Sequence, residues 1–105
     1  MKNNFKVFNA QIIDTFLGFD DHGILTFYLT LKISDGSHCS FGGIRITRST
    51  IEIIGKILNT VGVAKWEDLK SKFLRVYMDE WDAPIKEIGN LMDDKWFDIN
   101  EMKGE

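Results

Sequence analysis

The chain has little cysteine and little proline, and both shortages exclude classes of protein. One cysteine in 105 residues cannot form an internal disulfide, which excludes a disulfide-stapled scaffold and fits a reducing cytoplasm. One proline and the lack of low-complexity sequence give no sign of a linker, so we expect a single domain over residues 1–105. No apolar run is long enough to span a membrane, and the first residues lack a signal-peptide core.

Motifs of catalysis and of nucleotide-binding loops are also missing. The chain contains no Gly-x-Ser-x-Gly, no His-Glu-x-x-His, no Walker loop and no dinucleotide fingerprint. The cluster Asp20-Asp21-His22 falls in a turn, where neighbouring side chains point in different directions, and His38 and Cys39 face opposite sides of a strand. The pair Asp93-Asp94 is typical of a turn or a cap. We therefore expect a protein that is not an enzyme, with no catalytic residue, metal or cofactor.

Alternation of apolar and polar residues predicts an antiparallel sheet. Residues 24–34 alternate strictly, which is typical of a half-buried strand, and Asp35-Gly36 predicts a short hairpin after it. Apolar residues at helical spacing predict a helix over 51–61, with Gly62 placed for a C-cap. The predicted strands cover residues 5–16, 24–34, 38–46, 73–78 and 85–88. The fold class is therefore α+β, with about five strands and one main helix packed on one face.

Local patterns predict further details of this fold. In the strand at 5–16, Phe8, Ala10, Ile12 and Phe16 share one phase, while apolar residues in the other phase suggest cover on both faces. Such a strand and a half-exposed sheet edge are compatible with a dimer or a higher assembly. Gly89-Asn90 predicts a turn, Trp96-Phe97 is expected to close the core, and about 99–105 is expected to fray.

Gly42-Gly43 interrupts a run of strand-like residues from 39 to 46. A glycine inside a strand usually marks a β-bulge or a close approach of another group to the backbone. A one-residue bulge would place Phe41, Ile44 and Ile46 on one face of the sheet and would turn Arg45 to the other. The sequence leaves open whether the glycines form only a bulge or also cradle a ligand.

The segment after the glycines has the composition of an anion site. Ser49 and Glu52 fit a capping box, and the free N–H groups of a helix start favour an anion. Arg45 and Arg48, two of the three arginines in the chain, flank this start, and a guanidinium can donate two parallel hydrogen bonds to a phosphate. The alternative is that both arginines are simply solvated.

Aromatic side chains could stack on a ligand bound at this place. Tyr28 and Phe41 are candidates, and Trp81 lies in an acidic loop, where it either stacks on a ligand or folds back over the sheet. The predicted ligand-binding residues are Tyr28, Phe41, Gly42, Gly43, Arg45, Arg48, Ser49, Thr50 and Trp81. Together they would hold a phosphate at the helix start and a ring against an aromatic side chain.

Charge is distributed unevenly along the chain. Residues 1–78 contain 10 Lys and Arg against 7 Asp and Glu, whereas residues 79–105 contain 3 against 9, which together give the formal net charge of −3. The acidic end either is solvated or interacts with a partner. A net negative charge argues against non-specific nucleic-acid binding, so no direct nucleic-acid partner is expected.

Several short motifs, in their order and spacing, resemble a family of small proteins encoded by phages and prophages. The resemblance covers about residues 10–98, although the segment after Phe41-Gly42-Gly43 is shorter than in that family. The motifs are Asp21-His22-Gly23-Ile24, Phe41-Gly42-Gly43, Thr60-Val61-Gly62-Val63, Trp66-Glu67-Asp68-Leu69, Ile88-Gly89-Asn90 and Asp94-Lys95-Trp96-Phe97.

This resemblance implies a protein that acts in the cytoplasm of an infected bacterial host. Small phage proteins without catalytic motifs often bind components of host defence, so the leading hypothesis is an anti-defence protein that sequesters a nucleotide-type immune signal. The first alternative is an inhibitor similar to an anti-CRISPR protein, whose acidic residues would compete for the basic groove of a host nucleic-acid enzyme. The second alternative is an accessory factor in phage DNA metabolism.

Overall fold

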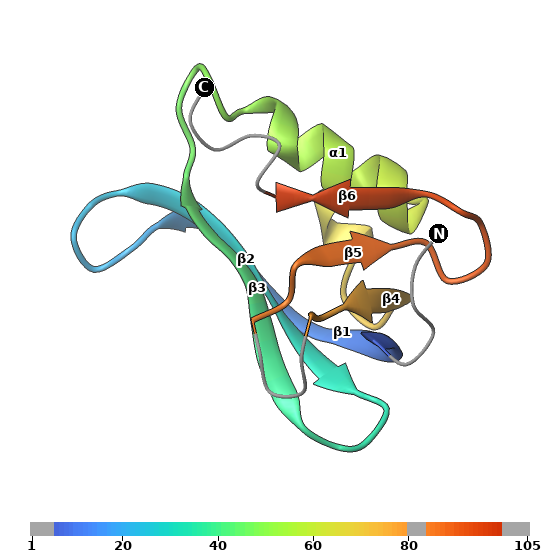
Figure 1. Ribbon diagram of the computed structural model, residues 1–105. Helices are drawn as coiled ribbons and strands as arrows, with labels where there is room; N and C mark the ends of the chain where they lie inside the picture. Colours follow the sequence, from blue (N-terminus) through green and yellow to red (C-terminus); the bar gives the residue numbers. More distant parts are fainter. Residues whose placement is uncertain (1–5, 80–83, 100–105) are drawn as a thin grey trace.

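The computed structural model describes residues 6–79 and 84–99, which form a six-stranded antiparallel sheet with one α-helix (Figure 1). The sheet order is β3-β2-β1-β4-β5-β6. Its strands are β1 (Val7–Phe19), β2 (Leu25–Ile33), β3 (His38–Arg45), β4 (Phe73–Tyr77), β5 (Glu87–Gly89) and β6 (Trp96–Asp98). Helix α1 (Glu52–Val61) and the short 3₁₀ helix η2 (Trp66–Asp68) connect β3 to β4.

The structure confirms the predicted α+β class, with an antiparallel sheet and one main helix, but it has one strand more than predicted. The additional strand is β6, because Trp96 and Phe97 pair with Gly89 and Ile88 of β5. Gly89, predicted to lie in a turn, is the last residue of β5, and the turn begins at Asn90. The predicted frayed end falls almost entirely on residues 100–105, outside the described part.

Strand β1 joins the two halves of the sheet. Its first half pairs with β4, from Val7↔Tyr77 to Gln11↔Phe73, and the stretch from Ala10 to Phe19 pairs with β2. A register shift between Ile12 and Asp14 inserts Ile13 as an extra residue. Because side chains alternate between faces, this bulge reverses the phase of the rest of the strand.

The bulge corrects the predicted phase of β1. Ala10 and Ile12 are buried, as a common phase requires, but Phe16 pairs with Tyr28 on the other face of the sheet. The prediction that Phe16 shares a face with Ala10 and Ile12 was therefore wrong. We call the face that carries Phe16 and Tyr28 the outer face, because the buried side chains of β2 alternate with Tyr28 and point to the opposite side.

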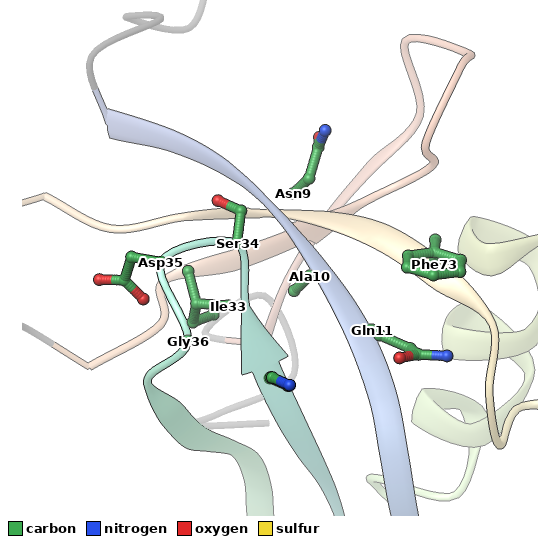
Figure 2. A pocket seen from close by; sticks show the side chains of 9 residues that line it. Asn9, Ala10, Gln11, Ile33, Ser34, Asp35, Gly36 and Phe73 are labelled. Atoms are coloured by element: carbon green, nitrogen blue, oxygen red, sulfur yellow. The ribbon is translucent and has the colours of Figure 1, made fainter.

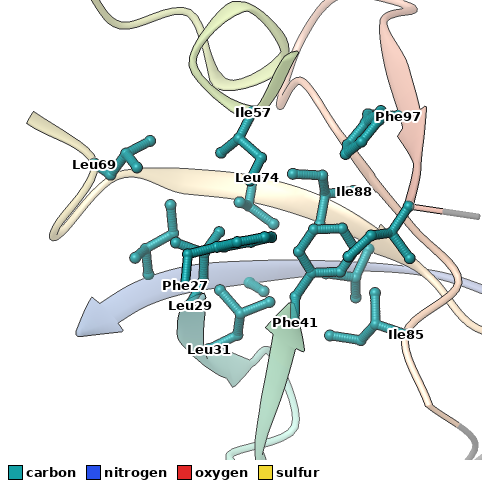
Figure 3. Packing of buried hydrophobic residues seen from close by; sticks show 14 of the residues in the cluster. Phe27, Leu29, Leu31, Phe41, Ile57, Leu69, Leu74, Ile85, Ile88 and Phe97 are labelled. Atoms are coloured by element: carbon teal, nitrogen blue, oxygen red, sulfur yellow. The ribbon is translucent and has the colours of Figure 1, made fainter. Parts of the chain in front are cut away.

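The sheet curls around its hydrophobic core. Phe41 of β3 and Phe97 of β6 belong to the two outermost strands in the sheet order, yet their rings meet edge to face with centroids 6.4 Å apart. Such a contact requires a sheet that is strongly coiled. Figure 3 shows these rings among the buried side chains of the central strands.

Helix α1 and the segment after it cover the inner face of the curled sheet. Ile53 and Ile57 are fully buried, and Figure 1 shows α1 lying beside β6. After the helix, Trp66 meets Phe27 edge to face at 6.2 Å, and Leu69 is fully buried. Neither α1 nor η2 combines the length and the apolar character that a crossing of the membrane requires.

Candidate functional site

The two glycines in β3 form the predicted β-bulge. The register with β2 shifts between Phe27 and Tyr28, so that Tyr28 pairs with Gly42 and Phe27 pairs with Ile44. Both glycines have a positive φ angle, 117° at Gly42 and 80° at Gly43. Residues other than glycine rarely adopt such angles. A Cβ atom on Gly42 would lie 2.7 Å from the ring of Phe27 and 2.9 Å from its carbonyl oxygen.

The bulge sorts the surrounding side chains as the sequence predicts. Phe41 and Ile46 are buried and Ile44 is partly buried, whereas Arg45 pairs with Thr26, which is in phase with Tyr28. Arg45 therefore lies on the outer face and is exposed. Thr26 supports the bulge, because its Oγ1 donates a 2.9 Å hydrogen bond to the carbonyl oxygen of Ile44.

Tyr28 forms an aromatic pair with Phe16 on the outer face. The two rings are nearly parallel, with an interplanar angle of 11° and centroids 5.1 Å apart. On its other side Tyr28 pairs with Gly42, which has no side chain, and 39% of Tyr28 is exposed. One flank of Tyr28 is therefore packed on Phe16. On the side of β3, its pairing partner Gly42 has no side chain that could cover it.

The predicted capping box at the start of α1 is wrong. The helix begins at Glu52, and no side chain caps Ile51. The capping interactions are centred on Thr47, two residues before the predicted cap Ser49. Thr47 Oγ1 accepts from the N–H of Ser49 (3.2 Å), and Thr50 Oγ1 accepts from the N–H of Thr47 (2.8 Å).

These threonines also change the expected anion site. The N–H groups of Thr50 and Ile51 both donate to the carbonyl oxygen of Thr47, and the N–H of Ser49 donates to the Thr47 hydroxyl. Thr50 Oγ1 in turn donates to the carbonyl oxygen of Arg45 at 2.7 Å. Three backbone donors that precede the helix thus have partners within the chain, which weakens the case for a phosphate held there.

The structure does not gather all the predicted site residues in one place. Tyr28, Gly42 and Arg45 share the outer face, and Arg48 is exposed in the turn that leads to α1. Phe41 is 2% exposed and packs on Phe97, so its ring is part of the core. Trp81 lies outside the described residues.

A groove of about 450 Å³ lies on the outer face at the opposite end of β2. Figure 2 shows Asn9 and Gln11 of β1 and Phe73 of β4 at this groove, which the β2–β3 turn borders. Lys32 also lines it, and Phe73 is 55% exposed. The strand register places Phe73 opposite Gln11, Gln11 opposite Lys32, and Lys32 opposite His38.

Sequence reasoning missed these residues, although part of the signal was present. Lys32 belongs to the polar phase of a strictly alternating strand, so its outward position could have been predicted. Phe73 and Gln11 could not be placed beside it from the sequence, because their register depends on the pairing of β1 with β4, which are more than 50 residues apart.

In the Asp20-Asp21-His22 cluster, the carboxylate of Asp20 has partners within its own turn. Asp20 Oδ1 accepts from the N–H groups of His22 (2.8 Å) and Ile24 (3.0 Å), which makes Asp20 the organiser of an exposed turn. Within the described ranges 6–79 and 84–99, no group of three or more His, Cys, Asp or Glu side chains could hold a metal ion.

No protein family, curated protein or solved structure compared with the chain matches it.

Proposed function

We propose that the protein binds a nucleotide-type ligand on the outer face of β1, β2 and β3. The observation that carries this proposal is the exposed Phe16–Tyr28 stack, whose second flank faces a glycine and whose face also carries Arg45. A planar base could stack on Tyr28, since aromatic side chains recognise bases through their π-faces. The bulge supports this arrangement, because its register shift brings Arg45 opposite Thr26, on the same face as Tyr28.

Arg45 is placed to bind the phosphate of such a ligand. It pairs with Thr26, two residues from Tyr28 along β2, and two residues of a strand span about 7 Å. A guanidinium at this distance from a stacked base can donate two hydrogen bonds to a phosphate. This arrangement differs from the helix-start site expected from the sequence, because it does not use the N–H groups that Thr47 occupies.

The biological role that we propose is sequestration of a nucleotide immune signal in an infected bacterial cytoplasm. The resemblance to small phage and prophage proteins supports this role, as does the lack of a catalytic motif in the sequence. Sequestration requires that the ligand be released intact. Incubation with an excess of protein, followed by heat denaturation and mass spectrometry of the supernatant, should therefore recover unmodified ligand, whereas a cleaved product would identify an enzyme.

The binding test is calorimetry and thermal shift against cyclic dinucleotides and ADP-ribose derivatives. A ligand that binds the folded state raises the melting temperature by mass action. We expect Tyr28→Ala to weaken binding by about 5- to 150-fold, since a base–aromatic stack contributes about 1–3 kcal/mol, and Arg45→Ala to weaken it as well. Tyr28→Phe is the matched control and should retain binding.

Two outcomes would reject the proposal. In the first, neither a nucleotide of the panel nor a short oligonucleotide binds at all. In the second, a nucleotide binds equally well to the wild type, to Tyr28→Ala and to Arg45→Ala. Arg48→Ala tests the site predicted from the sequence. If Arg48→Ala lowers the affinity for the nucleotide more than Arg45→Ala does, the phosphate is bound at the start of α1.

A further inference from the structure

We infer that the ligand is a linear oligonucleotide that runs along the outer face, from the Phe16–Tyr28 stack to the groove beside Phe73. This inference rests on the proposed function and extends it, because it assigns a second subsite and a minimum ligand length. The groove supplies what a second nucleotide unit needs: the exposed ring of Phe73, the cation of Lys32 and the carboxamide of Gln11.

The register places both subsites on one uninterrupted surface. Along β2, the outward side chains are Tyr28, Thr30 and Lys32, and each is paired with an outward position on β1 and on β3. Thr30 pairs with Asp14 and Ser40. These side chains are small or polar, so no bulky group separates the two subsites. Within residues 6–79 and 84–99, no helix covers this path, because the helical residues Ile53 and Ile57 are buried in the core on the other side of the sheet.

The separation of the two subsites sets the length of the ligand. Tyr28 and Lys32 are four residues apart on one strand, which corresponds to about 13 Å. A single strand with the rise of about 3.4 Å per nucleotide found in a duplex covers this distance with about four nucleotides. A single mononucleotide cannot contact both Tyr28 and Phe73.

The outer face presents a cation at each subsite even though the protein as a whole is acidic. Lys32 and Arg45 are these exposed cations, while Asp14 lies between them and Asp35 also lines the groove beside Lys32. Two further acidic residues, Glu87 and Asp98, lie opposite each other in the register of β5 and β6, at the far end of the sheet. The formal net charge of −3 therefore predicts weak non-specific binding but does not describe this surface.

The test is fluorescence anisotropy of the full chain with dye-labelled oligothymidylates of two, four, six and eight nucleotides. We expect affinity to rise steeply between two and four nucleotides and to level off above six. The logarithm of the association constant should fall with the logarithm of salt with a slope of about −1.4, because two cations each contact a phosphate of a single strand.

Four variants assign the second subsite. Phe73→Ala and Lys32→Gln should each weaken binding of the six-nucleotide probe at least fivefold, and Lys32→Gln should also reduce the salt slope by about half. Asp14→Asn should strengthen binding two- to threefold, because it removes the carboxylate from the path. Lys56→Gln, which removes an exposed cation from α1, is the matched control and should change binding less than twofold.

The outcomes separate this inference from the proposed function. If cyclic dinucleotides or ADP-ribose derivatives bind through Tyr28, and the oligothymidylates do not bind, the proposed function stands and the linear ligand is rejected. Oligothymidylate binding that is independent of length, or unaffected by Phe73→Ala and Lys32→Gln, also rejects the second subsite. If neither kind of probe binds, both proposals fail.

Discussion

The side-chain amide of Asn90 donates hydrogen bonds to the carbonyl oxygens of Thr60 (3.0 Å) and Val61 (3.3 Å) at the end of α1. Its Oδ1 accepts from the N–H groups of Met92 (3.0 Å) and Asp93 (2.9 Å) in the following turn. The last carbonyl groups of a helix have no partner within the helix. Asn90 therefore ties the end of α1 to the β5–β6 hairpin with one side chain.

Replacement of Asn90 should separate its two functions. Asn90→Asp keeps an oxygen acceptor for the turn but removes the donor to the helix, so we expect a loss of about 1–2 kcal/mol in the free energy of unfolding. Asn90→Ala removes both and should cost about 2–3 kcal/mol. Urea denaturation of the two variants measures the difference, and equal stabilities of wild type and Asn90→Asp would show that the bonds to the helix contribute nothing.

A second prediction concerns two glycines that should respond to alanine in opposite directions. A Cβ atom on Gly89 would lie 2.6 Å from the ring of Trp96, on which the guanidinium of Arg75 also packs at 4.8 Å. We expect Gly89→Ala to displace the indole and to cost about 2 kcal/mol or more.

Gly55→Ala is the matched control for Gly89→Ala. Gly55 lies inside α1, and a Cβ atom there would meet nothing within 4 Å. Alanine favours the helix over glycine by about 0.5–1 kcal/mol, so this variant should melt at a higher temperature than the wild type. A stabilised Gly89→Ala would contradict the close packing of Trp96 against β5.

A third prediction tests the corrected start of α1. Because Thr47 supplies the capping hydroxyl and Ser49 does not, Thr47→Ala should reduce the free energy of unfolding by about 1 kcal/mol. Ser49→Ala should change it by less than about 0.5 kcal/mol, as is usual for exposed positions. If thermal denaturation ranks the two variants the other way, the capping box predicted from the sequence is the correct one.

The sequence predicted the elements that carry a strong local signal. The strict alternation of β2 and the paired glycines of β3 were sufficient to place Arg45 and Phe41 on opposite faces. The bulge at Ile13 was missed because no glycine or proline marks it, so the phase of Phe16 could only follow from pairing with β2. Strand β6, which was missed, has three residues, which is too short for a period to be recognised.

The candidate site depends on both kinds of information. Tyr28 and Arg45 were predicted from their residue types and from the bulge, but their partner Phe16 and the groove around Phe73 depend on long-range register. At the start of α1, the sequence predicted a cap at Ser49, whereas in the structure the capping hydroxyl belongs to Thr47. The hydrogen bond from Thr50 Oγ1 to the carbonyl oxygen of Arg45 favours the cap at Thr47, and a contact of this kind between a side chain and the backbone has no recognisable sequence pattern.

The last prediction concerns the reactivity of Cys39. This half-buried residue pairs with Leu31 in the core, and burial, followed by the negative charge of Asp35, raises the pKa of its thiol. Since only the thiolate is nucleophilic, alkylation by iodoacetamide should be slow at pH 7.5, and its pH profile should have a midpoint above that of a free cysteine peptide. Asp35→Asn removes the smaller of the two causes and should move the midpoint slightly downward, whereas unfolding in urea should restore the rate of the peptide. A native midpoint at or below that of the peptide would contradict the packing of this thiol against the core.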